Sequence, residues 1–152
     1  MTWKTLTFND LTLEQLYQIM VVRQTVFVVE QNCPYLDADD NDQDCFHVLG
    51  YDENENLIAY SRIVPKGISY PNAVAMGRIL TTEKGRGKGI GKTLVQFSID
   101  ETRRIFDTNK IVISAQCYLI RFYENFGFKT VGEEYLEDDI PHIKMVLKFG
   151  NT

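Results

Sequence analysis

Six consecutive residues, Arg86 to Gly91, combine three glycines with two cations. Glycine lacks a Cβ atom, so the backbone of such a turn can approach a ligand closely. The apolar residues that follow recur at helical spacing, and the first amides of a new helix have no internal acceptor. Phosphate oxygens are natural partners for these amides, and cationic side chains add favourable charge. The run therefore predicts a phosphate-binding turn between a strand and a helix.

The spacing of the glycines separates three kinds of phosphate loop. The ATP and GTP loop requires a glycine where this chain has Arg86, although the Gly-Lys-Thr sequence that ends at Thr93 would complete it. The dinucleotide fingerprint Gly-x-Gly-x-x-Gly fails in every register of the run. These failures disfavour a nucleotide hydrolase. The pattern that fits is Arg/Gln-x-x-Gly-x-Gly/Ala, filled by Arg86, Gly89 and Gly91.

This last pattern resembles the pyrophosphate loop of the GCN5-related N-acetyltransferase (GNAT) family, whose members bind acetyl-coenzyme A. In that family a helix after the next strand often carries a tyrosine just ahead of a Gly-Phe pair, and residues 122–128 have this arrangement. The chain is most similar to the ElaA-like branch, with one departure at Asp139, where glycine is expected. The resemblance begins near residue 20 and reaches the C-terminus. Its matching segments are 26–35, 114–116 and 135–142.

The resemblance implies how the coenzyme is held. In this family one strand precedes the glycine loop, and another strand follows the helix after that loop. The two strands splay apart, and the pantetheine arm lies between them. Ile79, Leu80 and Thr81 would then bind the pantetheine and acetyl groups through their main chains, and Thr93 could add a hydroxyl group. The implied pyrophosphate-binding residues are Arg86, Gly87, Lys88, Gly89, Ile90 and Gly91.

The reaction that the resemblance implies is direct attack of a neutral primary amine on the thioester carbonyl of acetyl-CoA. Such a reaction needs a polarised carbonyl, a route for the amine proton and an acid for the departing thiolate. By analogy, the backbone amide of Leu80 polarises the carbonyl. Tyr123 is the candidate acid, since a phenol with a pKa near 10 stays protonated at neutral pH. Tyr123 also lies beside the apolar stripe of its helix, so an ordinary packed tyrosine is the alternative.

The proton acceptor is less well defined by the sequence. Glu30, His47, Glu137 and His142 are candidates, because all four belong to segments that border the acceptor end in this fold. A lone histidine on a strand, such as His47, is more often structural, and ordered water can also carry the proton. The alternative to an enzyme is a non-catalytic CoA-binding regulatory or interaction module. Thiol release on addition of an amine separates the two.

The elements that position these residues alternate along the chain. Strands interleaved with helices, with antiparallel pairs at the ends, predict an α/β fold with a mixed sheet. The resemblance implies a GNAT-like acyl-CoA N-acyltransferase fold, with a mostly antiparallel twisted sheet of about seven strands and about four flanking helices. The predicted strands are 3–8, 45–51, 57–64, 74–81, 111–115, 130–136 and 142–149. The predicted helical segments are 13–30, as two helices or one bent helix, 90–106 and 118–126.

Length and composition limit the function classes. A chain of 152 residues with 44% hydrophobic content forms one domain, residues 1–152, with a sizeable core. No apolar stretch is long enough to span a membrane and no signal-peptide core is present, so we expect a cytoplasmic protein without a membrane partner. A net charge of −5 without a basic stripe argues against nucleic acid. Three cysteines without paired ligand spacing predict neither disulfides nor a metal site.

Charge is unevenly distributed along the chain. Cations concentrate at 84–92, whereas acids gather at 37–44 and 133–139. One interpretation is a positive pocket for phosphates beside negative loops for a cationic acceptor, and the other is that the acidic loops are merely solvated. Polyamines, aminoglycosides, lysine side chains and protein N-termini all remain open as acceptors. Homodimers are common in the family, so the resemblance leaves room for one here.

Overall fold

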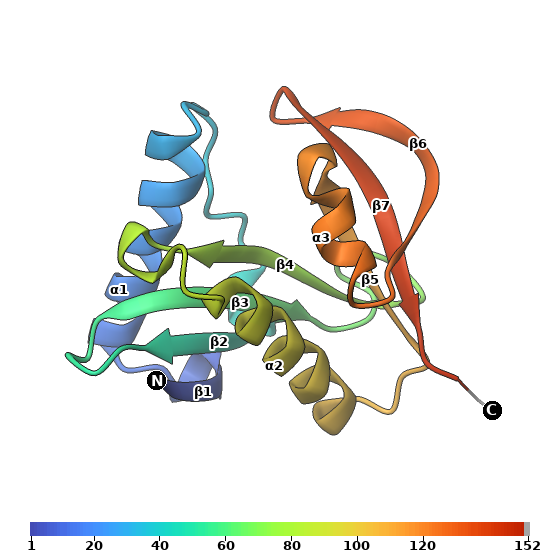
Figure 1. The fold of residues 1–152 in the computed structure, drawn as a ribbon. Coiled ribbons are helices and arrows are strands. Elements are labelled where there is room, and N and C mark those ends of the chain that lie inside the picture. The colour runs from blue at the N-terminus through green and yellow to red at the C-terminus, as the bar shows by residue number, and fades with distance from the viewer. Residues whose placement is uncertain (151–152) are drawn as a thin grey trace.

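The computed structural model describes residues 1–150, which form a sheet of seven strands in the order β1-β2-β3-β4-β5-β7-β6 (Figure 1). All neighbouring strands are antiparallel except β4 and β5, which are parallel. The predicted mostly antiparallel mixed sheet is therefore confirmed. The strands are β1 (Thr2–Thr7), β2 (Phe46–Tyr51), β3 (Leu57–Val64), β4 (Val74–Thr81), β5 (Lys110–Gln116), β6 (Lys129–Glu137) and β7 (Ile140–Lys148).

Three α-helices lie in the described part of the chain, α1 (Leu13–Arg23), α2 (Ile90–Ile105) and α3 (Ile120–Glu124). Thr12 begins α1 with a capping box that it shares with Gln15. The predicted helical segment 13–30 is divided, because a π-helical segment (Gln24–Glu30) follows α1. The predicted helix 118–126 is shorter than expected, since a 3-10 turn precedes α3 and Gly127, at a φ of 101°, follows it. None of these helices is long and apolar enough to cross a membrane.

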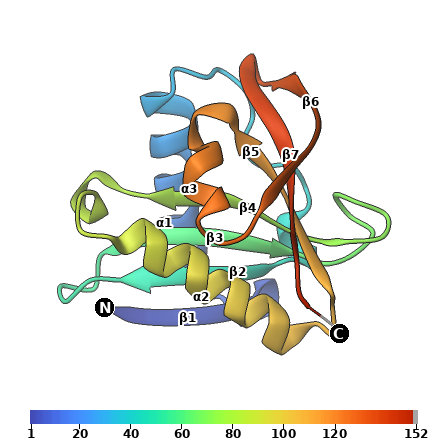
Figure 2. The same ribbon diagram turned by 45° about the vertical axis from the view of Figure 1, so that its right-hand side comes forward.

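The sheet separates two apolar clusters. Helices α2 and α3 cover one face and α1 covers the other (Figure 2). Successive residues of a strand point to opposite faces, so Val48 packs in the cluster under α2 and Leu49 packs in the cluster under α1. Ala59 and Tyr60 divide in the same way. Both helices that follow the glycine turn are thereby fixed on one side of the sheet.

Strands β4 and β5 pair only at their beginnings. The parallel register contains Val74 opposite Ile111 and Ala75 opposite Val112. Beyond these pairs, β4 continues along β3 to Thr81 and β5 continues along β7 to Gln116. The carboxyl ends of the two strands therefore diverge. Within residues 1–150, no other strand pairs with the two edges that face each other there. This divergence confirms the expected splay and positions the site.

A bulge interrupts β4 beyond the point where it diverges from β5. The β3 register passes from Leu80 opposite Tyr60 to Gly77 opposite Arg62, so Arg78 and Ile79 together face a single residue of β3. Arg78 has a φ of 49°, in the left-handed region that residues with a Cβ rarely adopt. The bulge changes the direction of the side chains at the end of β4.

Candidate active site

The glycine turn joins β4 to α2. Gly87 and Gly89 have φ values of 77° and 74°, which glycine adopts without steric cost. A Cβ atom at either position would meet nothing within 4 Å, so the surface above the turn is open. Gly89 is also the N-cap of α2 and provides no side-chain cap, so the first amides of that helix remain available to an anion. This geometry fits a phosphate group.

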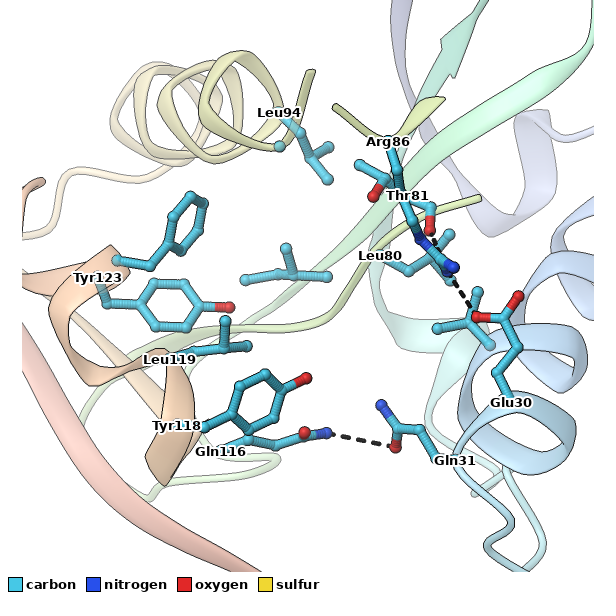
Figure 3. Close-up of a pocket in the computed structure, with 14 residues that line it drawn as sticks. Glu30, Gln31, Leu80, Thr81, Arg86, Leu94, Gln116, Tyr118, Leu119 and Tyr123 are labelled. Atoms are coloured by element: carbon cyan, nitrogen blue, oxygen red, sulfur yellow. Dashed lines mark hydrogen bonds and ion pairs between the residues drawn. The ribbon is translucent and has the colours of Figure 1, made fainter. Parts of the chain in front are cut away.

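Arg86 occupies the mouth of the turn. Its Nη2 donates to Glu30 Oε1 at 2.6 Å and to the carbonyl oxygen of Thr81 at 2.9 Å (Figure 3). Glu30 ends the π-helical segment, so the ion pair links that segment to the glycine turn. Glu30, one of the predicted base candidates, therefore lies on the glycine-turn side of the site beside a cation.

A first cavity of about 570 Å³ lies between β4 and α3. Figure 3 shows Leu80 and Arg86 on one wall, with Leu119 and Tyr123 on the other. The remaining coenzyme candidates Gly87, Lys88, Gly89, Ile90 and Thr93 belong to the turn and the start of α2 but do not line this cavity. Its lining residues are Val26, Glu30, Gln31, Ile79, Leu80, Thr81, Arg86, Gly91, Leu94, Gln116, Tyr118, Leu119, Phe122 and Tyr123.

A second cavity of about 560 Å³ adjoins the first where β4 and β5 diverge. The base candidates Glu137 and His142 line it, together with Ser114 and Arg78. Cross-strand pairing places His142 directly opposite Gln116. The two cavities therefore meet at a junction of four shared residues, which are Ile79, Gln116, Leu119 and Tyr123.

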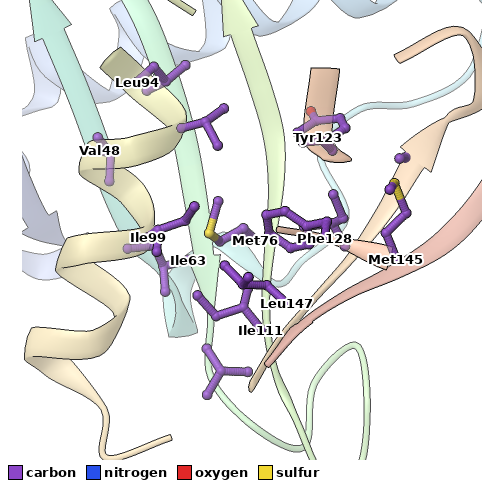
Figure 4. Close-up of a cluster of buried hydrophobic side chains, with 14 of the residues drawn as sticks. Val48, Ile63, Met76, Leu94, Ile99, Ile111, Tyr123, Phe128, Met145 and Leu147 are labelled. Atoms are coloured by element: carbon purple, nitrogen blue, oxygen red, sulfur yellow. The ribbon is translucent and has the colours of Figure 1, made fainter. Parts of the chain in front are cut away.

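Tyr123 is both a core residue and a cavity residue. Its side chain is buried, and its ring packs edge-on against Phe122 and Phe128, with centroid separations of 5.2 and 6.0 Å. Figure 4 shows Tyr123 and Phe128 within the buried apolar cluster. No side chain or backbone group of residues 1–150 forms a hydrogen bond with its hydroxyl, which Figure 3 shows pointing into the first cavity. Burial, with a smaller contribution from Tyr118, raises the pKa of Tyr123 well above its usual value. The phenol is therefore protonated at neutral pH.

Side chains from β5, β6 and β7 form a polar cluster at the second cavity, which Ser114, Glu137 and His142 line and Tyr135 does not. The Ser114 hydroxyl donates to Glu137 Oε1 at 3.1 Å and is hydrogen-bonded to the Tyr135 hydroxyl. His142 Nδ1 lies 2.7 Å from the carbonyl oxygen of Ile140, so Nδ1 carries the proton of the neutral ring. His142 Nε2 then faces Glu137 Oε2 at 3.6 Å and can accept a proton.

Ser114 and Tyr135 are functional candidates that the sequence reasoning did not name. Both lie in segments that carried the family resemblance, at 114–116 and 135–142. That resemblance was the available signal, but it did not show that the two hydroxyls meet across strands.

His47 lies outside both cavities, so its candidacy as a base is corrected to a structural role. The side chain is fully buried. Nε2 lies 2.9 Å from the carbonyl oxygen of Asp42, and Nδ1 lies 2.6 Å from the Tyr60 hydroxyl. Since a carbonyl oxygen can only accept, Nε2 donates to Asp42 and Nδ1 accepts from Tyr60. Burial lowers the pKa of His47, so this neutral tautomer persists.

Three carboxylates of the acidic loop 37–44, those of Asp37, Asp39 and Asp42, are held in ion pairs, so for these three neither interpretation holds: they are neither free for a cationic acceptor nor merely solvated. Asp42 Oδ1 accepts from Arg23 Nη1 at 2.6 Å and from Arg62 Nη1 at 2.9 Å. Arg23 is fully buried and Arg62 nearly so. Burial opposes ionisation of Asp42, but hydrogen bonds and charge from the two guanidinium groups outweigh it and hold its pKa below the usual range.

The remaining loop carboxylates complete this network. Asp37 lies 2.6 Å from Arg23 Nε and 2.8 Å from Arg78 Nε. Asp39 accepts from Arg62 Nη1 and Nη2 at 2.8 and 2.7 Å. Three carboxylates of one loop thus neutralise three arginines of α1, β3 and β4. Within residues 1–150, no cluster of three or more His, Cys, Asp or Glu side chains could hold a metal ion.

Comparison with known proteins agrees with this geometry. Residues 14–149 match the family model described as an acetyltransferase (GNAT) domain. Protein ElaA of Escherichia coli K12 is 39% identical over 145 residues, which cover 94% of each chain. A UPF0039 protein of Synechocystis sp. is 38% identical over 146 residues, covering 96% of this chain and 94% of that protein.

Solved structures give the same result. An acyl-CoA N-acyltransferase from Pseudomonas aeruginosa superposes with a TM-score of 0.89 at 34% identity, and Escherichia coli ElaA with 0.88 at 37%. Each comparison covers 97% of this chain and 99% of the other. An aminoglycoside 6'-N-acetyltransferase complexed with coenzyme A shares the fold at 16% identity and a TM-score of 0.74, with coverage of 100% and 99%. The chain therefore belongs to the GNAT family of N-acetyltransferases, with ElaA-like relatives that match it over nearly its whole length.

Proposed function

We propose that this N-acetyltransferase uses acetyl-CoA and transfers the acetyl group to a primary amine by direct attack. The fit of the coenzyme rests on two features of the chain. The turn around Gly87 and Gly89 has an open surface and an uncapped helix start, which suit a pyrophosphate. The edge of β4 that faces β5 is not paired with β5 beyond Ala75. An extended arm could lie there along Ile79, Leu80 and Thr81, where Arg86 holds the Thr81 carbonyl oxygen.

The chain would hold the coenzyme from both ends of the first cavity. Arg86 and Lys88 would supply charge to the pyrophosphate, which would lie over the amides from Gly87 to Gly91, and Thr93 would lie near its edge. The Thr93 hydroxyl donates to the carbonyl oxygen of Gly89 at 3.3 Å, so it would have to rotate away from that carbonyl to donate to a phosphate oxygen. When bound, acetyl-CoA supplies an activated acyl group.

The chemistry would take place at the junction of the two cavities. The Leu80 amide would polarise the carbonyl, and the Tyr123 hydroxyl would protonate the departing sulfur as the carbon–sulfur bond breaks and the carbon–nitrogen bond forms. The observation that carries this proposal is that Tyr123 lines both cavities and that its hydroxyl has no hydrogen-bond partner within residues 1–150. An acid in that position reaches the coenzyme side and the amine side at once.

The amine would arrive through the second cavity. There Glu137, oriented by Ser114, would attract the ammonium group, and His142 Nε2 would accept the proton that the amine releases. Glu30 is less suited to this role because Arg86 holds it on the coenzyme side. This leaves Glu137 and His142 as the proton route from the four candidates.

The proposal is tested by two measurements on one preparation. Calorimetric titration with acetyl-CoA is expected to show saturable binding, and a panel of amines is expected to include acceptors that cause thiol release. Absence of binding would overturn the assignment of the glycine turn. The second candidate is a non-catalytic CoA-binding module. It would bind acetyl-CoA at the same glycine turn but would not release thiol with any amine.

Replacement of Gly89 by valine is expected to weaken acetyl-CoA binding by roughly tenfold or more. A β-branched residue disfavours the left-handed backbone conformation that Gly89 adopts in the glycine turn. Gly132→Val is the matched control, because Gly132 has a φ of 79°, a Cβ there meets nothing within 4 Å, and it lies on β6 away from the turn. Both variants bear similar backbone strain, so calorimetry should show weakened binding in the first alone. Equal affinities of the two variants for acetyl-CoA would contradict the assignment of the glycine turn to coenzyme binding.

A further inference from the structure

The second cavity has walls of opposite charge. Glu137 and Asp138 come from the end of β6 and the turn after it, whereas Arg78 comes from the bulge of β4, beside Arg62 and Asp39, which also line the cavity. An adjoining space of about 60 Å³ is lined by Glu137, Asp138 and Arg78 together with His142 and Gln116. Anionic and cationic side chains therefore face one another across a single space next to the junction that holds Tyr123.

The bulge directs Arg78 into this space. At a φ of 49°, Arg78 adopts a conformation that is unfavourable for a residue with a Cβ. Such strain persists only where the surrounding structure imposes it, and it is concentrated at binding and catalytic sites. The β3 register shift between Tyr60 and Arg62 imposes the strain here, and the result is a guanidinium group that lines both the second cavity and the adjoining space.

Arg78 also retains unused hydrogen-bond donors. Its Nε lies 2.8 Å from Asp37 Oδ1, and its Nη2 lies 3.2 Å from the Asp37 carbonyl oxygen and 3.7 Å from Asp39 Oδ2. Within residues 1–150, Nη1 contacts no acceptor. The Arg78 side chain is 27% exposed, compared with 0% for Arg23 and 5% for Arg62. Arg78 is thus the most exposed of the three arginines in this network.

We infer that the acceptor is a zwitterion, an amino compound whose carboxylate binds Arg78 while its amino end lies near Glu137 and Tyr123. This inference rests on the proposed function and narrows its substrate class. A guanidinium group recognises a carboxylate through charge-assisted hydrogen bonds. A polyamine or another purely cationic acceptor would instead place a second positive charge against Arg78. Arg78 is accordingly a specificity-determining residue, and the chain selects small amino acids or related compounds.

The experiment compares matched acceptors. Glycine, β-alanine, γ-aminobutyrate and longer straight-chain ω-amino acids are each paired with the amine of equal length that lacks the carboxylate. For the best-fitting length, kcat/KM of the amino acid is expected to exceed that of its partner by about ten- to a hundredfold, the range of one hydrogen bond to a charged group. In Arg78→Gln this ratio is expected to fall toward one, and Arg78→Lys should restore part of it.

The ratio of the two kcat/KM values distinguishes a role of Arg78 in recognising the carboxylate from a role in holding the acidic loop in place. Loss of folded protein lowers both rates of a pair equally and leaves their ratio unchanged. Arg104→Gln is the control, since Arg104 is an exposed arginine of α2 that pairs with Glu101, and its ratio should match the wild type. A wild-type ratio near one at every length, or an unchanged ratio in Arg78→Gln, would overturn the inference while the proposed function stands. Turnover of no amine at all would overturn the proposed function and this inference with it.

Discussion

Tyr123→Phe is expected to lower kcat by about a hundred- to ten-thousandfold while affinity for acetyl-CoA stays close to that of the wild type. The substitution removes one hydroxyl and keeps the ring that packs against Phe122 and Phe128. Since that hydroxyl has no hydrogen-bond partner in the part of the chain described, its loss leaves no buried group unpaired. Thiol release under saturating coenzyme measures the rate, and calorimetric titration measures the affinity.

Tyr118→Phe makes the same chemical change elsewhere in the first cavity. Tyr118 lines that cavity but is 75% exposed, and it does not line the second cavity. Its variant should retain most of the turnover. A wild-type rate in Tyr123→Phe would remove Tyr123 as the acid, whereas equal losses in both variants would assign the effect to the cavity surface rather than to a proton donor.

Asp42→Asn is expected to destabilise the folded protein by about 3 to 5 kcal/mol, the usual result of removing one partner from a buried ion pair. Asp42 is the carboxylate shared by Arg23 and Arg62, and both arginines are buried. A neutral amide in its place leaves two guanidinium groups with less compensating charge in a medium that solvates them poorly. Denaturant unfolding followed by tryptophan fluorescence and far-UV circular dichroism gives the free energy of unfolding.

Asp44→Asn serves as the matched control, because Asp44 is an exposed carboxylate in the same 3-10 turn. Its effect should stay within about 0.5 kcal/mol. A similarly small change for Asp42→Asn would show that the network contributes little to stability.

The free energy of unfolding at acid pH provides a second test of Asp42. The pKa of Asp42 is lower in the folded protein, so its contribution is present above pH ~4 and is lost as pH falls through the folded-state pKa. Asp42→Asn should lack that part of the acid destabilisation.

The ion-pair network links stability to the geometry of the acceptor side. Asp37 and Asp39 hold the loop after the π-helical segment against β3 and β4, and the same contacts orient Arg78. The end of the β6–β7 hairpin also touches this loop, since the Tyr35 hydroxyl donates to Asp139 Oδ2 at 2.5 Å. The two segments that the sequence associated with acceptor choice are therefore in contact with each other, and the buried charges fix one of them.

The prediction of the coenzyme side depended on local signals. Glycines at 87 and 89 are needed because the backbone there has positive φ, and a motif of six residues specifies such a turn without distant contacts. The seven strands were predicted for a similar reason, since alternation and turn residues act over a few positions. Helix limits were less accurate: the π-helical segment 24–30 and the short α3 arise from packing that residue periodicity does not encode.

By itself, then, the sequence determined the glycine turn, the order of the strands and the place of Tyr123 after β5, because each depends on neighbouring residues. Only the tertiary structure decided what the acidic loop does. Its carboxylates pair with arginines that lie 14 to 41 positions away, and such partners are chosen by how the sheet brings strands together. The same reason applies to His47, which burial removes from the site, and to Ser114 and Tyr135, whose hydroxyls meet across separate strands. Charge and reactivity depend on the final surroundings of a group, and those surroundings are formed by long-range contacts.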